Sequence, residues 1–264
     1  MYFNFEKKID LNPKDLNDPV VLIGFPGIAL VSKLAISSIK DAIGAELFLD
    51  IDCFDFPPKS KVENGSLEIP TAQVFYKSSE SMNQDNDIFI LTADYQPQTP
   101  EGVFEFSKIF CEEMDKFTGS KIKMYISSGA LVTDKVNDTP QVHICGTHPD
   151  LVESFLKQEN TQLMDSGVIA GANGILPAWA GSKGFAPGIC LLAETLPLPM
   201  MSLDPRASKA LVELLKNYFT IDMDFSEIDK KIEEMETIFD SFRQQADRYM
   251  QEPDSNSDSD SYFR

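Results

Sequence analysis

Histidine, tryptophan and cysteine are scarce in this sequence of 264 residues, which contains 2 histidines, 1 tryptophan and 4 cysteines. Both histidines fall within one short segment, so any metal site or acid–base pair that uses histidine must be built there. The cysteines lie far apart among apolar residues, which predicts buried, reduced thiols rather than a disulfide framework. They are Cys53, Cys111, Cys145 and Cys190.

Basic residues are too few to balance the acidic ones, because 23 Lys and Arg stand against 42 Asp and Glu, a formal net charge of −19. A chain of this charge repels nucleic acid phosphates and anionic membrane surfaces, so we expect neither as a partner. No apolar run approaches the roughly 18 residues of a membrane span. Residues 1–11 contain no apolar core of a signal peptide. We therefore expect a cytoplasmic protein.

The residues that are present can build a packed core, because hydrophobic residues make up 42% of the chain and charged residues 25%. The length favours one large domain. Short apolar segments alternate with segments of helical spacing, which predicts an α/β fold of three layers with a mixed, largely parallel sheet. The predicted strands cover residues 20–23, 46–54, 67–76, 87–92, 123–127, 142–144, 168–170 and 189–193, and the predicted helices cover residues 28–43 and 103–117. Asn64-Gly65 predicts a hairpin turn before the third strand.

The C-terminal part predicts two helices and a tail. Asp204-Pro205 places an N-cap and a proline at the start of a helix that completes the α/β domain, which we assign to residues 1–221. Residues 222–251 form a predicted amphipathic helix, whose apolar stripe either packs on its own domain or pairs with a neighbouring subunit. Residues 252–261 are only Pro, Ser, Asn, Asp and Glu, so we expect 252–264 to be an acidic, disordered tail.

Two glycine-rich segments are candidates for a nucleoside or phosphate site. Gly24 and Gly27 lie between a predicted strand and a predicted helix, where backbone N–H groups can bind an anion. Gly171 and Gly174 belong to a second such turn. Neither segment has the lysine and hydroxyl residue of a P-loop or the spacing of a dinucleotide fingerprint. The alternative is that these glycines permit positive φ and close packing of a helix on a strand.

The clustered histidines suggest a metal site, because His143, Cys145 and His148 are all possible ligands. A fourth ligand is not evident nearby, so we expect no bound metal. Ser127 and Ser128 follow a predicted strand, but they lack the Gly-x-Ser-x-Gly elbow of a serine hydrolase.

Two carboxylates, Asp94 and Glu194, lie just beyond predicted strands, where α/β proteins often place functional groups. Either could act as a general base, and Asp94 could instead cap a helix. The sequence gives no means of bringing them together. Because no catalytic set emerges, we expect a protein that binds other proteins, with no enzymatic activity and no cofactor.

Six short motifs occur in an order and spacing that resemble the PAC2 family, the proteasome assembly chaperone family, from about residue 20 to residue 219. They are Gly24-Phe25-Pro26-Gly27-Ile28, Phe56-Pro57-Pro58, Asp94-Tyr95-Gln96-Pro97, Ile169-Ala170-Gly171-Ala172-Asn173-Gly174, Ala193-Glu194-Thr195 and Asp204-Pro205-Arg206-Ala207. The resemblance implies a fold like that of nucleoside phosphorylases without an established catalytic site. It also implies homo-oligomers, or hetero-oligomers with a related chain, that contact the α subunits of the 20S proteasome.

Some archaeal members of this family end in a hydrophobic-tyrosine-any motif that docks between α subunits. Tyr262, Phe263 and Arg264 resemble that motif, with phenylalanine in the place of tyrosine. A terminal carboxylate in a basic pocket, with aromatic rings buried beside it, would give each tail a weak anchor, and several tails would act together. We expect a proteasome assembly chaperone or ATP-independent activator. The alternative is an enzyme or ligand-binding protein that uses the glycine loops near Gly27 and Gly174.

Overall fold

The computed structural model describes residues 3–134, 139–196, 203–234 and 237. Within them, nine strands form one sheet in the order β1-β3-β6-β7-β2-β8-β11-β9-β10, and β4 and β5 form a separate hairpin. The strands are β1 (Phe3–Lys7), β2 (Val20–Gly24), β3 (Glu46–Cys53), β4 (Lys61–Glu63), β5 (Ser66–Glu68), β6 (Thr71–Lys77), β7 (Ile88–Ala93), β8 (Met124–Val132), β9 (Val142–Gly146), β10 (Thr161–Leu163) and β11 (Gly188–Thr195). The hairpin forms at the predicted Asn64-Gly65 turn.

The sheet is mixed, as predicted, and its parallel part lies at the centre. Strands β7, β2, β8 and β11 are parallel to one another, and the edge strand β10 is parallel to β9. The remaining neighbours pair in antiparallel fashion. The expected α/β class is therefore confirmed, while parallel pairing is less extensive than predicted.

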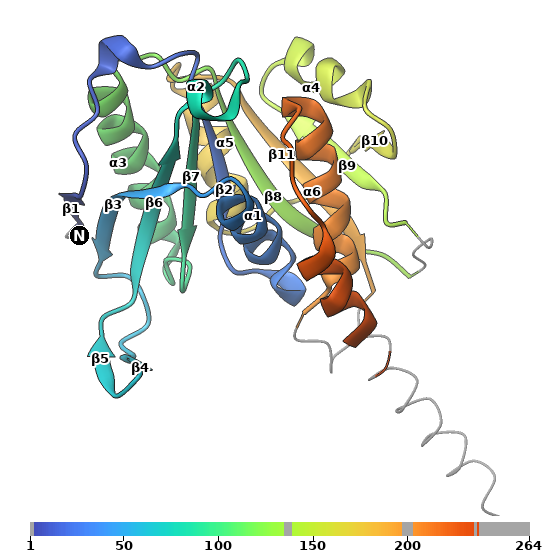
Figure 1. Cartoon of the computed structure of the whole chain (residues 1–264), viewed down its shortest axis with the longest axis horizontal. Coiled ribbons are helices and arrows are strands. Elements are labelled where there is room, and N and C mark those ends of the chain that lie inside the picture. The colour runs from blue at the N-terminus through green and yellow to red at the C-terminus, as the bar shows by residue number, and fades with distance from the viewer. Residues whose placement is uncertain (1–2, 135–138, 197–202, 235–236, 238–264) are drawn as a thin grey trace, which may run out of the picture.

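Helices cover both faces of the sheet (Figure 1). One face carries α1 (Val31–Ala42) and α6 (Pro205–Phe219), which contact each other, and the other face carries α3 (Pro100–Thr118) and α5 (Ala172–Ser182). The shorter elements are α2 (Ser79–Met82), α4 (Pro149–Leu156), and the 3-10 turns η1 (Pro13–Asp15) and η2 (Ile28–Leu30). This arrangement gives the three layers that the alternation of strands and helices predicts.

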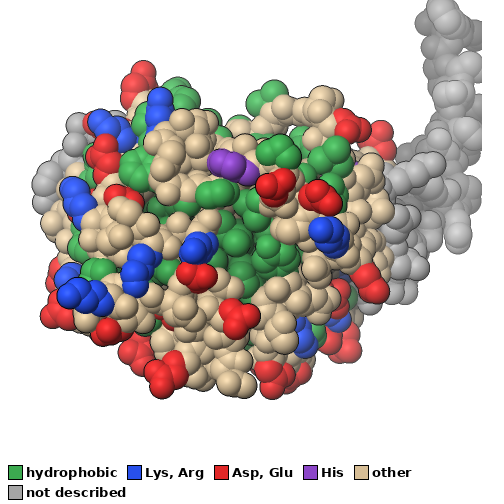
Figure 2. All heavy atoms as spheres, turned by 90° about the horizontal axis from the view of Figure 1, so that it is seen from above, with side chains coloured by type: hydrophobic (Ala, Val, Ile, Leu, Met, Phe, Trp, Pro, Cys, Tyr) green, Lys and Arg blue, Asp and Glu red, His purple; other side chains and the backbone are tan. Residues whose placement is uncertain are grey.

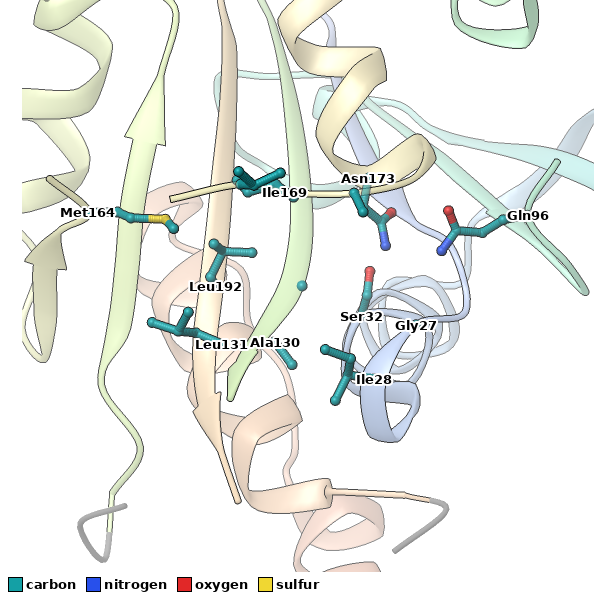
Figure 3. Close-up of a pocket in the computed structure, with 13 residues that line it drawn as sticks. Gly27, Ile28, Ser32, Gln96, Ala130, Leu131, Met164, Ile169, Asn173 and Leu192 are labelled. Atoms are coloured by element: carbon teal, nitrogen blue, oxygen red, sulfur yellow. The ribbon is translucent and has the colours of Figure 1, made fainter. Parts of the chain in front are cut away.

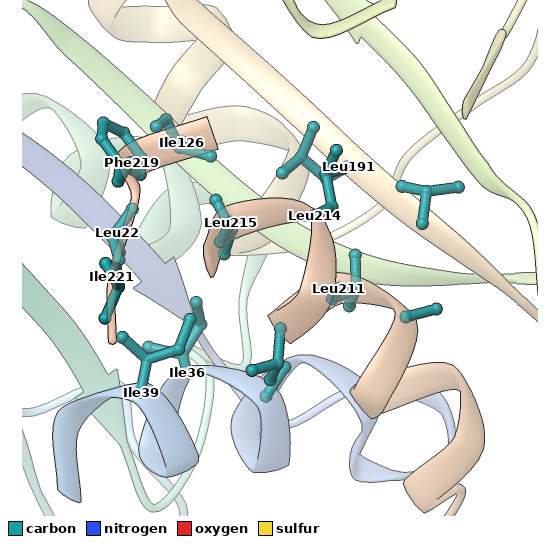
Figure 4. Packing of buried hydrophobic residues seen from close by; sticks show 14 of the residues in the cluster. Leu22, Ile36, Ile39, Ile126, Leu191, Leu211, Leu214, Leu215, Phe219 and Ile221 are labelled. Atoms are coloured by element: carbon teal, nitrogen blue, oxygen red, sulfur yellow. The ribbon is translucent and has the colours of Figure 1, made fainter. Parts of the chain in front are cut away.

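The core lies on both faces of the central strands. Every residue of β2 and β7 is buried, since side chains of successive residues point to opposite helix layers. On one face, Leu211 of α6 and Ile36 of α1 pack with Leu22 of β2 in a single apolar cluster (Figure 4). On the other face, Val21 packs with the α3 and α5 layer. Burial on both sides explains the continuous apolar runs of these strands.

Three strand predictions need correction. The predicted strand 67–76 is divided into β5 and β6, because Pro70 lies between them and cannot donate to a strand ladder. The predicted strand 123–127 is too short, because strand β8 continues through Gly129 to Val132. The missing Cβ of Gly129 leaves room for the Leu192 side chain. Residues 168–170 form no strand. The strand that pairs with β9 at the edge of the sheet is β10, a segment with no strong sequence pattern.

The predicted C-terminal helix is present over residues 226–234, where the Asp224 carboxylate accepts a hydrogen bond from the Ser226 N–H at 3.0 Å. Ile228 is buried in the cluster of α1 and α6, and Phe225 packs against it. The first turns of this helix thus pack on their own domain. Ile232 packs against the same cluster, and the later residues of the predicted stripe, together with the predicted tail, lie outside the described residues.

The outer surface is mixed in character. On the face that carries α2 and α4, acidic and basic side chains surround a central group of hydrophobic side chains (Figure 2). The excess of acidic residues therefore does not make this face uniformly negative. In the described part of the chain, no helix is long and apolar enough to cross a membrane.

Candidate functional site at the carboxyl ends of the parallel strands

The central parallel strands end at one edge of the sheet, and a pocket of about 300 Å³ lies there (Figure 3). The chain places β7 on one side of β2 and β8 on the other. In α/β proteins, the crevice beside such a switch in strand order is the usual place for a ligand. The pocket is lined by Gly27, Ile28, Ser32, Gln96, Gly129, Ala130, Leu131, Met164, Val168, Ile169, Ala170, Asn173 and Leu192.

The first glycine loop connects β2 to α1 at the edge of this pocket. Gly24 lets the helix approach the strand, because a Cβ at this position would lie 2.5 Å from Ile36 Cβ. Gly27 borders the pocket, and a Cβ there would meet only the Asn173 amide nitrogen, at 3.9 Å. Ala29 and Leu30 then adopt left-handed φ angles of 46° and 49°, which is uncommon for residues with side chains. The pocket rim therefore stores backbone strain.

The second glycine loop precedes α5 on the opposite side of the pocket. Gly171 has a φ of 76°, and a Cβ at this residue would collide with the Gln96 amide oxygen. A Cβ at Gly174 would collide with the Ile169 carbonyl oxygen. Packing thus accounts for Gly24, Gly171 and Gly174, as in the alternative interpretation. A ligand-binding role for the four glycines stays a prediction.

Two side-chain amides connect the glycine loops. The Asn173 amide accepts a hydrogen bond from the Phe25 N–H at 3.1 Å and donates to the Phe25 carbonyl at 3.2 Å. Gln96 donates to the Pro26 carbonyl at 2.6 Å and accepts from the Ala172 N–H at 2.8 Å. These bonds connect segments far apart in the sequence, so they hold the two loops at a defined separation.

Asp204 connects the start of α6 to the end of β11 and to the first glycine loop. It accepts hydrogen bonds from the Arg206 and Ala207 N–H groups at the start of α6, both at 3.1 Å, and from the Thr195 hydroxyl at 2.7 Å. The Asp204 N–H donates to the Ala29 carbonyl at 2.9 Å. The predicted N-cap is therefore confirmed, and it also joins the end of β11 to the strained rim.

The three possible metal ligands point to different partners. The His143 Nε2 lies 3.0 Å from the Glu194 carboxylate, and the His148 Nδ1 lies 2.9 Å from the Thr147 hydroxyl. Cys145 lies opposite Cys190 in the β9–β11 register. Among the residues described, no group of three His, Cys, Asp or Glu side chains is arranged to hold a metal ion.

The paired cysteines affect each other's protonation. A hydrogen bond from the Cys190 thiol lowers the pKa of Cys145 to about 7, and the same bond raises the pKa of the buried Cys190. The Ser127 side chain also contacts Cys190 rather than a histidine. The Ser128 hydroxyl is buried without a hydrogen-bond partner. Neither serine is therefore bonded to the histidine and carboxylate pair that a hydrolase would need.

The two carboxylates considered as bases lie apart in the sheet, on β11 and beyond β7. Glu194 binds His143, as described above, and its second oxygen accepts from the Gln141 N–H at 3.3 Å. Asp94 forms ion pairs with Lys33 at 3.3 Å and Lys61 at 3.7 Å. Both carboxylates thus have structural partners.

The pocket includes residues that sequence patterns did not mark. Ser32 was assigned no role, because a serine in an apolar-spaced helix gives no local signal of facing a cavity. Gln96 and Asn173 occurred only inside longer motifs. For Asn173, the only signal in the sequence was its position in a glycine-rich turn, where a side-chain amide can bond to a neighbouring loop. The proposed docking residues Tyr262, Phe263 and Arg264 lie outside the described residues.

Similar proteins cover nearly the whole chain. An uncharacterised protein of Methanocaldococcus jannaschii is 26% identical over 236 residues, which is 89% of this chain and 86% of the relative. The crystal structure of Pyrococcus furiosus PbaB, described as an archaeal proteasome activator, has a TM-score of 0.82 and 24% identity, covering 91% of this chain and 98% of PbaB. Pyrococcus furiosus PbaA, described as an archaeal homologue of a proteasome-assembly chaperone, has a TM-score of 0.69 and 22% identity, covering 95% and 100%.

These likenesses establish a shared fold, and the family match goes further. The motifs quoted from the sequence now have positions in that fold, since both glycine loops and Gln96 contribute residues to the lining of one pocket, and Asp204 bonds to the first of these loops through Ala29. The PAC2 family model matches residues 21–242. The chain therefore belongs to the PAC2 family.

Proposed function

We propose that this protein binds the 20S proteasome and acts as an assembly chaperone or an ATP-independent activator. The observation that carries the proposal is the near full-length match to PbaB, since 98% of that chain is covered at a TM-score of 0.82. Membership of the PAC2 family and the similarity to PbaA support the same role. The proposed role requires binding rather than catalysis.

The proposed contact is the α ring, with Tyr262, Phe263 and Arg264 as anchors. In this hypothesis the rings bury apolar area between α subunits while the terminal carboxylate is bound by basic groups. Residues 252–261 would act as a polar tether of about 20 Å. Phenylalanine at position 263 has no hydroxyl, so a hydrogen bond available to tyrosine would be missing.

Oligomerisation is part of this proposal because a three-residue anchor binds weakly by itself. A homo-oligomer, or an oligomer with a related chain, would present several tails to one ring. Linked binding of this kind can raise affinity by about 10² to 10⁴ without new contacts. Light scattering of the purified protein at several concentrations would determine whether the required oligomer exists.

The test measures binding of the full chain to purified 20S proteasome, with peptide hydrolysis read in the same samples. A chain that ends at Ser261 should bind at least about tenfold more weakly. A chain with one glycine added after Arg264 should lose affinity similarly, because the carboxylate moves by about 3.5 Å. Ser257→Ala, within the tether, is the matched control and should bind like the unaltered chain.

The outcomes separate the two roles. Tail-dependent binding with faster hydrolysis would identify an activator, and tail-dependent binding without it would favour an assembly role. Phe263→Tyr should strengthen binding if the tyrosine hydroxyl is used in the docking site. If the truncated chain binds as tightly as the full chain, the tail mechanism is wrong. If neither chain binds, the proteasome hypothesis itself fails.

A further inference from the structure

A buried hydroxyl without a partner faces the pocket at the carboxyl ends of the strands. Ser32, on the first turn of α1, is 2% exposed, and its Oγ has no hydrogen-bond partner. Ser32 is one of the residues that line the pocket. Buried polar groups in folded proteins are almost always paired, so an unpaired hydroxyl that faces a cavity indicates a missing hydrogen-bonding group.

Two further donors face the same space. The Asn173 and Gln96 amide nitrogens each donate one hydrogen bond to a loop carbonyl, and each amide group carries a second N–H. Figure 3 shows both nitrogens and the Ser32 oxygen pointing toward one region of the pocket. The hydrogen bonds to the glycine loops fix both amides in place. These three groups therefore supply hydrogen-bond donors to the same part of the pocket.

The rest of the pocket is apolar and becomes more exposed toward its mouth. Leu192 is 4% exposed, whereas Ile28 is 53% exposed and Val168 is 93% exposed. Among the lining residues that the structure describes, none carries a charged or aromatic side chain. The polar end is deep, since Ser32 and Asn173 are both buried. The pocket thus has a donor-rich inner end and aliphatic walls.

We propose that this pocket binds a small, neutral aliphatic carbonyl compound, with the carbonyl oxygen innermost against Ser32, Asn173 and Gln96. A volume of about 300 Å³ corresponds to roughly ten non-hydrogen atoms or fewer, taking about 30 Å³ for each. The aliphatic part of the ligand extends toward Ile28 and Val168. This site is separate from the C-terminal residues proposed to contact the proteasome.

The lining residues distinguish this ligand class from the nucleoside or phosphate expected at the glycine loops. A phosphate needs cationic groups or several free N–H groups, but the Phe25 N–H is already bonded to Asn173. A nucleobase is usually held by aromatic or apolar faces together with matched polar groups on its edge. The pocket instead matches one acceptor atom and an aliphatic chain.

Nuclear magnetic resonance titration of the full chain tests the proposal with three probes of equal chain length. Hexanamide is neutral and has a carbonyl acceptor, hexylammonium is a cation without an acceptor, and hexanoate is an anion. Hexanamide should bind saturably and shift resonances of residues around Ser32. Hexylammonium should bind at least about tenfold more weakly, because its ammonium group can donate only to the Ser32 hydroxyl and would face the N–H groups of Asn173 and Gln96.

Two serine variants form a matched pair. Ser32→Ala should weaken hexanamide binding about fivefold to tenfold, the usual effect of losing one hydrogen bond. Ser128→Ala removes another buried, unpaired hydroxyl, but Ser128 does not line the pocket, so the affinity should not change. Both substitutions remove an unpaired polar group and should leave the fold intact. Gly27→Val adds a side chain toward Asn173 and should abolish binding.

The proposal is overturned if hexanamide does not bind, if hexylammonium binds equally well, or if Ser32→Ala binds hexanamide as tightly as the unaltered chain. Tighter binding of hexanoate than of hexanamide would also contradict it, since that result would indicate an anion site. None of these outcomes affects the proteasome hypothesis, because proteasome binding is measured through the C-terminal residues.

Discussion

Removal of the Asp204 carboxylate should destabilise the protein more than removal of an ordinary helix cap. Asp204 is 2% exposed and Thr195 is fully buried, so Asp204→Ala leaves two N–H groups of α6 and the Thr195 hydroxyl without their acceptor. Loss of an N-cap costs about 1 kcal/mol. An unpaired buried hydroxyl costs about 1–3 kcal/mol more. We therefore expect Asp204→Ala to lower the free energy of unfolding by about 2–4 kcal/mol.

Urea unfolding followed by circular dichroism measures this change, with the m-value as a check that the folded state is still compact. The double variant Asp204→Ala, Thr195→Val removes both members of the buried bond. It should be more stable than the sum of the two single variants predicts, by about 1 kcal/mol or more. Ser78→Ala, which removes the cap of the short surface helix α2, is the matched control and should cost about 1 kcal/mol or less.

Two results would refute this reasoning. If Asp204→Ala costs no more than Ser78→Ala, the buried network contributes nothing beyond capping. If the Asp204 and Thr195 variants are additive, the 2.7 Å hydrogen bond between them does not stabilise the fold.

Three further predictions concern the same structure. Gly171→Ala should lower the free energy of unfolding by more than about 1 kcal/mol, because this residue has a left-handed φ and the new Cβ would collide with Gln96. Gly65→Ala is the control, since it has the left-handed φ without a collision. Equal losses of stability in urea unfolding would contradict this prediction. Burial and the nearby Asp87 charge raise the pKa of Tyr76 above its ordinary value of 10, so the folded state keeps this proton longer and stability should fall as the pH rises above 10. The urea midpoint of Tyr76→Phe should fall less steeply over that range, and parallel curves would show that another group is responsible. The rate at which iodoacetamide alkylates Cys145 should rise with pH, with a midpoint near pH 7. Cys190→Ala should move that midpoint toward the ordinary thiol pKa of 9. An unchanged midpoint would rule out the hydrogen bond between the thiols as the cause of the lowered pKa.

Local patterns were enough to predict several elements. The apolar run of β2 predicted a strand buried on both faces, and Asn64-Gly65 predicted the β4–β5 turn. Asp204 was predicted to cap α6, and it does so through N–H groups only two and three residues away. Each of these features depends on neighbours in the sequence, so the sequence contains the information directly. The division of the strand at Pro70 was missed because apolar and polar residues alternate on both sides of this proline.

The candidate site depended on contacts between distant segments. Asn173 bonds to Phe25 across 148 positions, and Gln96 bonds to Ala172 across 76. The pairing of Cys145 with Cys190 follows from the register of two antiparallel strands, which neither strand specifies alone. By itself, then, the sequence determined which segments become strands, turns and capped helices, because those choices rest on local backbone chemistry. Only the tertiary structure decided that Ser32, Gln96 and Asn173 face one pocket, because strand order and helix packing bring them together.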